Sequence, residues 1–138
     1  MLIFFPLIIC IKKFKNYSFP VQTYFNNHSE GCISVAITLD SKFIASLSAQ
    51  FPQVLAIWEW TTDSEMPVCT AEIDQMYGLQ SNVRFNLNNI SQVLTNNQSQ
   101  VIFYEWNFET GLTYFCPEIN DEVNYYLKFS TLNFDFEK

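Results

Sequence analysis

The chain has 138 residues, of which 49% are hydrophobic and 17% aromatic, enough apolar material for one domain with a buried core. Its formal net charge of −7 lacks the cationic face that nucleic-acid binding requires, so we exclude that class of function. The four cysteines include no Cys-x-x-Cys pair and there is one histidine, which disfavours a metal site and any other cofactor built on such ligands. Scattered cysteines of this kind favour a reduced, cytoplasmic location over a disulfide framework.

The N-terminal segment carries ten consecutive apolar residues, 2–11, followed at once by Lys12 and Lys13. Ten residues are too few to span a bilayer, and a secretory signal places its positive charge before the apolar stretch. We interpret residues 1–27 as an apolar extension of the domain and disfavour a membrane anchor. A signal or anchor segment is the alternative, and four Asn-x-Ser/Thr sequons would suit a secreted protein.

Period-two alternation predicts a first group of strands between residues 28 and 73. Apolar side chains alternate along 32–39, and a turn containing Asp40 leads into a second strand at 43–48. A third strand is predicted at 54–60, and 68–73 completes the group as an outer strand. Short strands joined by tight turns form an antiparallel meander.

A second copy of this pattern follows. The segment 83–87 matches 35–39 at an offset of 48 residues, and 103–106 matches 57–60 at an offset of 46. A repeat of this length with four short strands is typical of a β-propeller blade. The sequence therefore predicts an all-β fold of about two four-stranded antiparallel blades, at 28–73 and 74–120. Residues 121–138 repeat the start of the pattern and are interpreted as the start of a third blade or a tail.

The first unit resembles a WD repeat, in which a histidine precedes the first strand, an aspartate occupies the next turn and a tryptophan lies on the third strand. His28, Asp40 and Trp58 stand at these positions. The resemblance implies an incomplete WD-repeat propeller. It also implies a buried hydrogen-bond chain that joins His28, the Trp58 indole and a serine of the second strand, either Ser46 or Ser48.

The amino-acid sequence within the two units, from Glu30 to Asp40 and from Tyr77 to Asn86, resembles that of one WD-repeat family in particular. That family comprises cilia- and flagella-associated proteins of the calmodulin- and spoke-associated complex at the radial spoke base. The resemblance implies a structural role in the axoneme of motile cilia, with axonemal complex subunits as partners. The calcium-binding loops of that family have no counterpart motif in this sequence.

No catalytic constellation is visible in the sequence. His28 has no nucleophile or acid placed beside it by any known motif, and phosphate-binding and nucleophile-elbow motifs do not occur. Glu59 and Glu105 occupy equivalent positions a blade apart, which disfavours a carboxylate pair. We therefore predict a protein that is not an enzyme and takes no small-molecule substrate. Trp60 and Trp106 are candidates for an interaction surface, with packing between blades as the alternative.

Two functional hypotheses follow. The first is a non-catalytic WD-repeat scaffold segment that mediates protein–protein interaction in the axoneme. The second is a secreted or membrane-tethered β-rich ligand-binding domain, which the apolar N-terminal residues and the sequons favour. Because propellers close with four to eight blades, we also expect this chain to be marginally stable or to aggregate when it is isolated.

Overall fold

The computed structural model describes residues 28, 30–62, 64 and 66–117. Predictions for the extension at 1–27 and for a third blade or tail at 121–138 lie outside the described residues. Within the described part, all regular structure is β-strand apart from one short 3-10 helix, η1 (Gln75–Tyr77). None of the helices among these residues has the length and apolar character needed to cross a membrane.

The first sheet is an antiparallel meander in which sequence neighbours pair in the order β1-β2-β3-β4. Its strands are β1 (Cys32–Ile37), β2 (Phe43–Ser48), β3 (Val54–Glu59) and β4 (Cys69–Glu72). Strands β2 and β3 are rich in β-branched and apolar residues, and every residue of β2 is buried. The two central strands therefore carry the core of this unit.

The second sheet repeats the same topology in the order β5-β6-β7-β8. Its strands are β5 (Asn82–Phe85), β6 (Gln92–Asn96), β7 (Val101–Asn107) and β8 (Gly111–Phe115). The turn into β8 uses Gly111 at a φ of 73°, a left-handed conformation that side-chain-bearing residues rarely adopt. As predicted, the described residues thus form two four-stranded antiparallel sheets.

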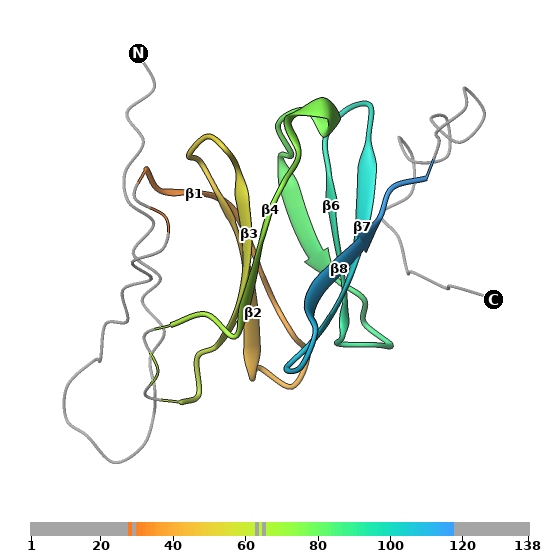
Figure 1. Ribbon diagram of the computed structural model, residues 1–138. Coiled ribbons are helices and arrows are strands. Elements are labelled where there is room, and N and C mark those ends of the chain that lie inside the picture. Colours follow the sequence, from red (N-terminus) through yellow and green to blue (C-terminus); the bar gives the residue numbers. More distant parts are fainter. Residues whose placement is uncertain (1–27, 29, 63, 65, 118–138) are drawn as a thin grey trace.

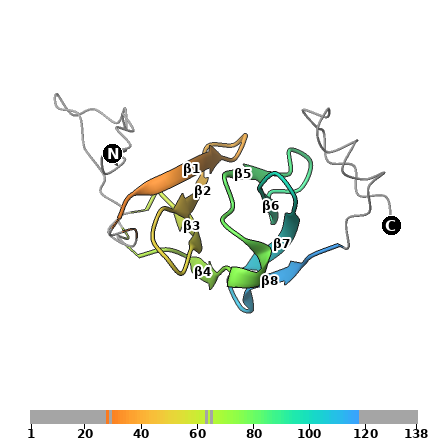
Figure 2. The same ribbon diagram turned by 90° about the horizontal axis from the view of Figure 1, so that it is seen from above.

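The two sheets pack face to face and share one hydrophobic core (Figure 1). Viewed from above, β1 lies next to β5 at one edge of the pair, and β4 lies next to β8 at the other (Figure 2). The first sheet contributes alternate residues of its two central strands, Phe43, Ala45, Leu47, Leu55 and Ile57. Across the seam lie Val83, Phe85, Val93, Ile102, Tyr104 and Trp106.

Because side chains alternate along each strand, the two faces of the first sheet carry different residues and have different neighbours. One face points to the second sheet, while the other carries a separate buried cluster of Ile44, Ala56 and Trp58. The second sheet likewise presents one face to the core and one face away from the first sheet. Of the predicted site residues, Trp58 lies on the outward face of the first sheet and Trp106 in the shared core.

Candidate interaction site

The first buried polar network joins three elements of the first sheet. Ser46 of β2 lies at its centre, because its Oγ accepts a hydrogen bond from Trp58 Nε1 at 2.7 Å and pairs with His28 Nε2 at 2.7 Å. The His28 and Trp58 rings meet edge to face, with their centroids 6.3 Å apart. All three residues are buried. The network therefore connects the segment before β1 to β2 and β3.

Ser48, the other serine considered for this network, hydrogen bonds elsewhere. Its Oγ accepts a hydrogen bond of 2.7 Å from the backbone N–H of Val54. That bond closes the loop between β2 and β3. The geometry thus resolves the two serines: Ser46 bridges the histidine and the tryptophan, and Ser48 supports a turn.

The second sheet contains an equivalent network with different residues, which the sequence reasoning missed. Pairing registers place Thr95 where the first sheet has Ser46, and Tyr104 where it has Trp58. Thr95 Oγ1 donates to Gln80 Oε1 at 3.2 Å. The buried Tyr104 lies on the neighbouring strand, and burial raises its pKa. Gln80 thus takes the place of the histidine.

The Gln53 side chain makes three hydrogen bonds, two of which connect the first sheet to the second. Its side-chain nitrogen donates to the carbonyl of Ser48 at 3.0 Å and to the carbonyl of Gln80 at 2.9 Å. Its side-chain oxygen accepts from the backbone N–H of Gln80 at 2.8 Å. Both glutamines are fully or nearly fully buried. This contact fixes the β2–β3 loop of the first sheet against the start of the second sheet.

The predicted turn residue Asp40 organises the connection between β1 and β2. Its carboxylate accepts hydrogen bonds from the Thr38 hydroxyl at 2.6 Å and from the backbone N–H of Lys42 at 3.1 Å. These two donors, the hydroxyl first, lower the pKa of Asp40. Ser41 accommodates the tight turn with a φ of 57°.

Trp106, predicted as part of an interaction surface, lies instead in the core between the sheets. It is 3% exposed, its ring packs against Phe43 with centroids 4.8 Å apart, and its indole N–H donates to the carbonyl of Ile90 at 2.8 Å. Trp106 therefore packs between the two sheets, which was the alternative considered from the sequence. Trp60 is half-buried against the Trp58 cluster, and its indole N–H has no hydrogen-bond partner among the described residues.

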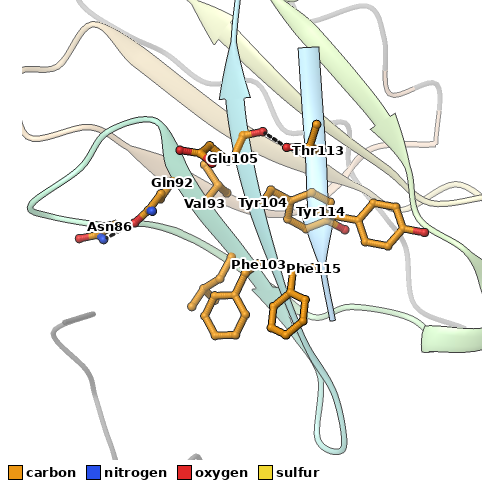
Figure 3. A pocket seen from close by; sticks show the side chains of 10 residues that line it. Asn86, Gln92, Val93, Phe103, Tyr104, Glu105, Thr113, Tyr114 and Phe115 are labelled. Atoms are coloured by element: carbon orange, nitrogen blue, oxygen red, sulfur yellow. Dashed lines mark hydrogen bonds between the residues drawn. The ribbon is translucent and has the colours of Figure 1, made fainter. Parts of the chain in front are cut away.

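The outward face of the second sheet contains a cavity of about 250 Å³. Figure 3 shows Phe103 and Phe115, which pair directly across β7 and β8, at the apolar end of this cavity. Its other end is polar, with the side chains of Asn86 and Gln92 joined by a 2.8 Å hydrogen bond. Glu105 and Thr113 line the same cavity, and Leu94 contributes to its floor.

Cys32 and Cys69 are poorly suited to nucleophilic chemistry. Burial raises the pKa of Cys32, and it raises the pKa of Cys69 to about 11, so both thiols stay protonated near neutral pH. Across residues 28 to 117, so far as they are described, no group of three or more His, Cys, Asp or Glu side chains is arranged to hold a metal ion. The buried polar groups tie strands together, and the outward sheet face can contact another protein surface.

Comparison with curated proteins gives a consistent result. The chain is similar to the cilia- and flagella-associated protein 251 of Mus musculus, with 41% identity over 107 residues, or 75% of this chain. Its counterpart in Pongo abelii is 37% identical over 107 residues. The protein of the same name in Tetrahymena thermophila is 31% identical over 105 residues, or 71% of this chain. The chain spans only 8%, 9% and 10% of the lengths of these three relatives.

Comparison with solved structures confirms the predicted all-β propeller fold. The β-propeller domain of Cps50 (Swd1) from Myceliophteria thermophila superimposes with a TM-score of 0.51, over 65% of this chain and 27% of that domain's chain. Sequence identity is 8%, so this likeness concerns the fold alone. No family model matches the chain. The described residues thus form two blades of a β-propeller, similar in sequence to a short portion of cilia- and flagella-associated proteins.

Proposed function

We propose that this chain is a non-catalytic WD-repeat scaffold segment that mediates protein–protein interaction in the axoneme of motile cilia, at the radial spoke base. The observation that carries this proposal is the 31% to 41% identity to cilia- and flagella-associated protein 251 over 71% to 75% of this chain. Its partners are other axonemal proteins. It acts without a cofactor or a small-molecule substrate.

The buried polar residues support a structural role in place of a catalytic one. His28 and Ser46 are the pair that would first suggest acid–base chemistry, yet both lie buried and the Ser46 oxygen is occupied by the Trp58 indole. A nucleophile needs an accessible oxygen and a general base beside it. The WD-repeat assignment gives the same three residues a function in holding strands together.

An immunoblot of fractionated ciliated cells tests the proposal. Native cilia are separated into membrane plus soluble matrix and salt-washed axonemes, and the blot uses an antibody raised against residues 28–106. A dynein heavy chain and a ciliary membrane protein serve as fraction markers. We expect a band far above 16.2 kDa, the mass of this chain, that stays with the axonemes.

Two results would contradict the proposal. A band that leaves with the soluble matrix would remove the axonemal scaffold role. A glycosylated band in the membrane fraction, shifted by a glycosidase, would favour a secreted or membrane-tethered ligand-binding domain instead. Chemical cross-linking of intact axonemes with the same antibody then identifies the neighbouring subunits.

A further inference from the structure

Two connections at one end of the sheet pair carry exposed apolar side chains. Phe51, in the β2–β3 loop, is 64% exposed, while Met76 in η1 and Leu79 just after it are 77% and 59% exposed. In Figure 1 both connections lie at the top, opposite the β1–β2 turn. Large apolar side chains that gather on one part of a protein surface mark a site of contact with another molecule.

Buried hydrogen bonds join these two connections to each other. The Gln53 side chain accepts the backbone N–H of Gln80 at 2.8 Å and donates to the Gln80 carbonyl at 2.9 Å. Phe51 lies two residues before Gln53, and Leu79 directly precedes Gln80. The exposed apolar side chains of the two loops are therefore held by one hydrogen-bonded unit.

The segment around η1 is fixed in the same way. The carbonyl of Tyr77 accepts hydrogen bonds from the side-chain nitrogens of Gln80 and Asn97, both at 3.0 Å. The carboxylate of Asp74 caps η1 by accepting the backbone N–H of Met76 at 2.9 Å. Because the backbone is already ordered, a partner that binds here loses little affinity to the ordering of these loops.

The charged side chains at this end are acidic. Glu30 precedes β1, Glu72 ends β4 and Asp74 caps η1, and all three are exposed. In the described part of the chain the lysine and arginine residues lie elsewhere, with Lys42 in the β1–β2 turn at the opposite end and Arg84 within β5. A partner that covers this end therefore carries positive charge, whereas nucleic acid and anionic membranes are repelled.

We propose that Phe51, Met76 and Leu79 form a docking surface for an amphipathic helix of another protein, one whose apolar stripe is flanked by lysine or arginine residues. The apolar stripe packs on the three side chains, and the flanking basic residues face Glu72 and Asp74. This inference rests on the protein-interaction role proposed above and names the chemistry of the partner. It does not depend on the ciliary location.

Nuclear magnetic resonance of the full 138-residue chain with ¹³C-labelled methionine methyl groups tests the contact directly. The probe is a helical peptide of leucine and lysine, and the control peptide has glutamate in place of every lysine. We expect the leucine–lysine peptide to shift the Met76 methyl signal, which is assigned with the variant Met76→Leu. The Met66 methyl is the internal control, because Met66 is 70% exposed in the connection between β3 and β4 at the opposite end.

Affinities of matched variants for the fluorescently labelled leucine–lysine peptide give a second readout. The double variant Phe51→Ser with Leu79→Ser should raise Kd about ten-fold or more, because two contact side chains are lost. Leu39→Ser is the control, since Leu39 is 73% exposed in the β1–β2 turn, and it should change Kd by less than about two-fold. All these side chains are exposed, so each variant should keep the near-ultraviolet circular dichroism spectrum of the parent.

The contribution of charge is tested by the double variant Glu72→Gln with Asp74→Asn. Asparagine still caps η1, so the variant removes charge without removing the hydrogen bond to the Met76 N–H. We expect weaker binding of the leucine–lysine peptide and a smaller loss of affinity when the salt concentration is raised.

Four outcomes would overturn the proposal. They are binding of neither peptide, equal binding of both peptides, a shift of the Met66 signal as large as that of Met76, and an equal rise of Kd in Leu39→Ser and in the Phe51→Ser, Leu79→Ser double variant. None of these outcomes changes where the native protein fractionates. Failure of the docking surface is therefore distinguishable from failure of the axonemal role, which the immunoblot tests.

Discussion

Replacing Gln53 by alanine should destabilise the chain more than any other single polar substitution in the described residues. The side chain is 3% exposed and makes three hydrogen bonds, to the Ser48 carbonyl and to both backbone groups of Gln80. Alanine leaves those groups, including the N–H of a fully buried residue, without this partner. Each buried polar group that loses its partner costs about 1–3 kcal/mol.

We expect Gln53→Ala to lower the free energy of unfolding by about 2–4 kcal/mol, allowing for partial relaxation of the loop. Domains of this size have roughly 5–15 kcal/mol in total, so the change is a large fraction. The assay is urea denaturation followed by tryptophan fluorescence, since Trp106 lies in the same core. Trimethylamine N-oxide in the buffer stabilises the folded state of a chain that we expect to be marginally stable.

Gln98→Ala is the matched control, because Gln98 is an exposed glutamine in the loop between β6 and β7. It should change the free energy of unfolding by less than about 0.5 kcal/mol. If Gln53→Ala were as mild as this control, the two hydrogen bonds from Gln53 to Gln80 would not hold the two sheets together.

The remaining predictions use the same assay unless stated. Trp58→Phe should lower the free energy of unfolding by about 1–3 kcal/mol because Ser46 loses its buried donor. Trp60→Phe removes a buried N–H that has no partner in the described region, so it should lower the free energy of unfolding by less than about 0.5 kcal/mol. Equal losses of stability in the two variants would refute this contrast. Gly111→Ala should cost about 1–2 kcal/mol because φ is 73°, although the added Cβ meets no atom within 4 Å. Alkylation of Cys69 by iodoacetamide should be slow at pH 8 and accelerate as the pH rises toward its pKa of about 11; a rate at pH 8 matching free cysteine would contradict the burial of the thiol.

The strand pattern of the first sheet could be predicted because local chemistry and packing agree there. The alternation from Cys32 to Ile37, the Asp40 turn and the apolar segment from Val54 onward each require a strand–turn–strand path, and the sheet follows it. The second sheet was predicted through its offset from the first. Its first two strands, β5 and β6, are shorter and more polar than β1 and β2, so alternation alone is a weaker signal there.

The orientation of the tryptophans could not be predicted for a simple physical reason. Alternation shows that Tyr104 and Trp106 share one face of a strand, but it does not show which face meets a neighbouring sheet. In the structure both point into the shared core. The exposed alternative at Trp106 was therefore wrong, and deciding it required knowing on which side the first sheet lies.

The two polar networks use different residue types, so the histidine–tryptophan pattern of the first does not predict the second. Both blades must satisfy polar groups at the entrance to the first strand and tie them to the two central strands, but the donors and acceptors can differ. His28, Ser46 and Trp58 form one solution, and Gln80 and Thr95 form the other. A search for histidine and tryptophan finds only the first.

The difference between these networks has a consequence for how the blades are held. The network of His28 lies on the face of the first sheet that points away from the second, whereas that of Gln80 lies in the seam and is extended by Gln53 into the neighbouring loop. A glutamine offers both a donor and an acceptor from one side chain, so Gln80 can bond to Thr95 and to its own turn while its backbone holds Gln53. Replacing Gln80 by histidine would restore the more familiar residue type yet remove one of these bonds. Gln80, which stands where the first unit uses a histidine, therefore also attaches the second blade to the first.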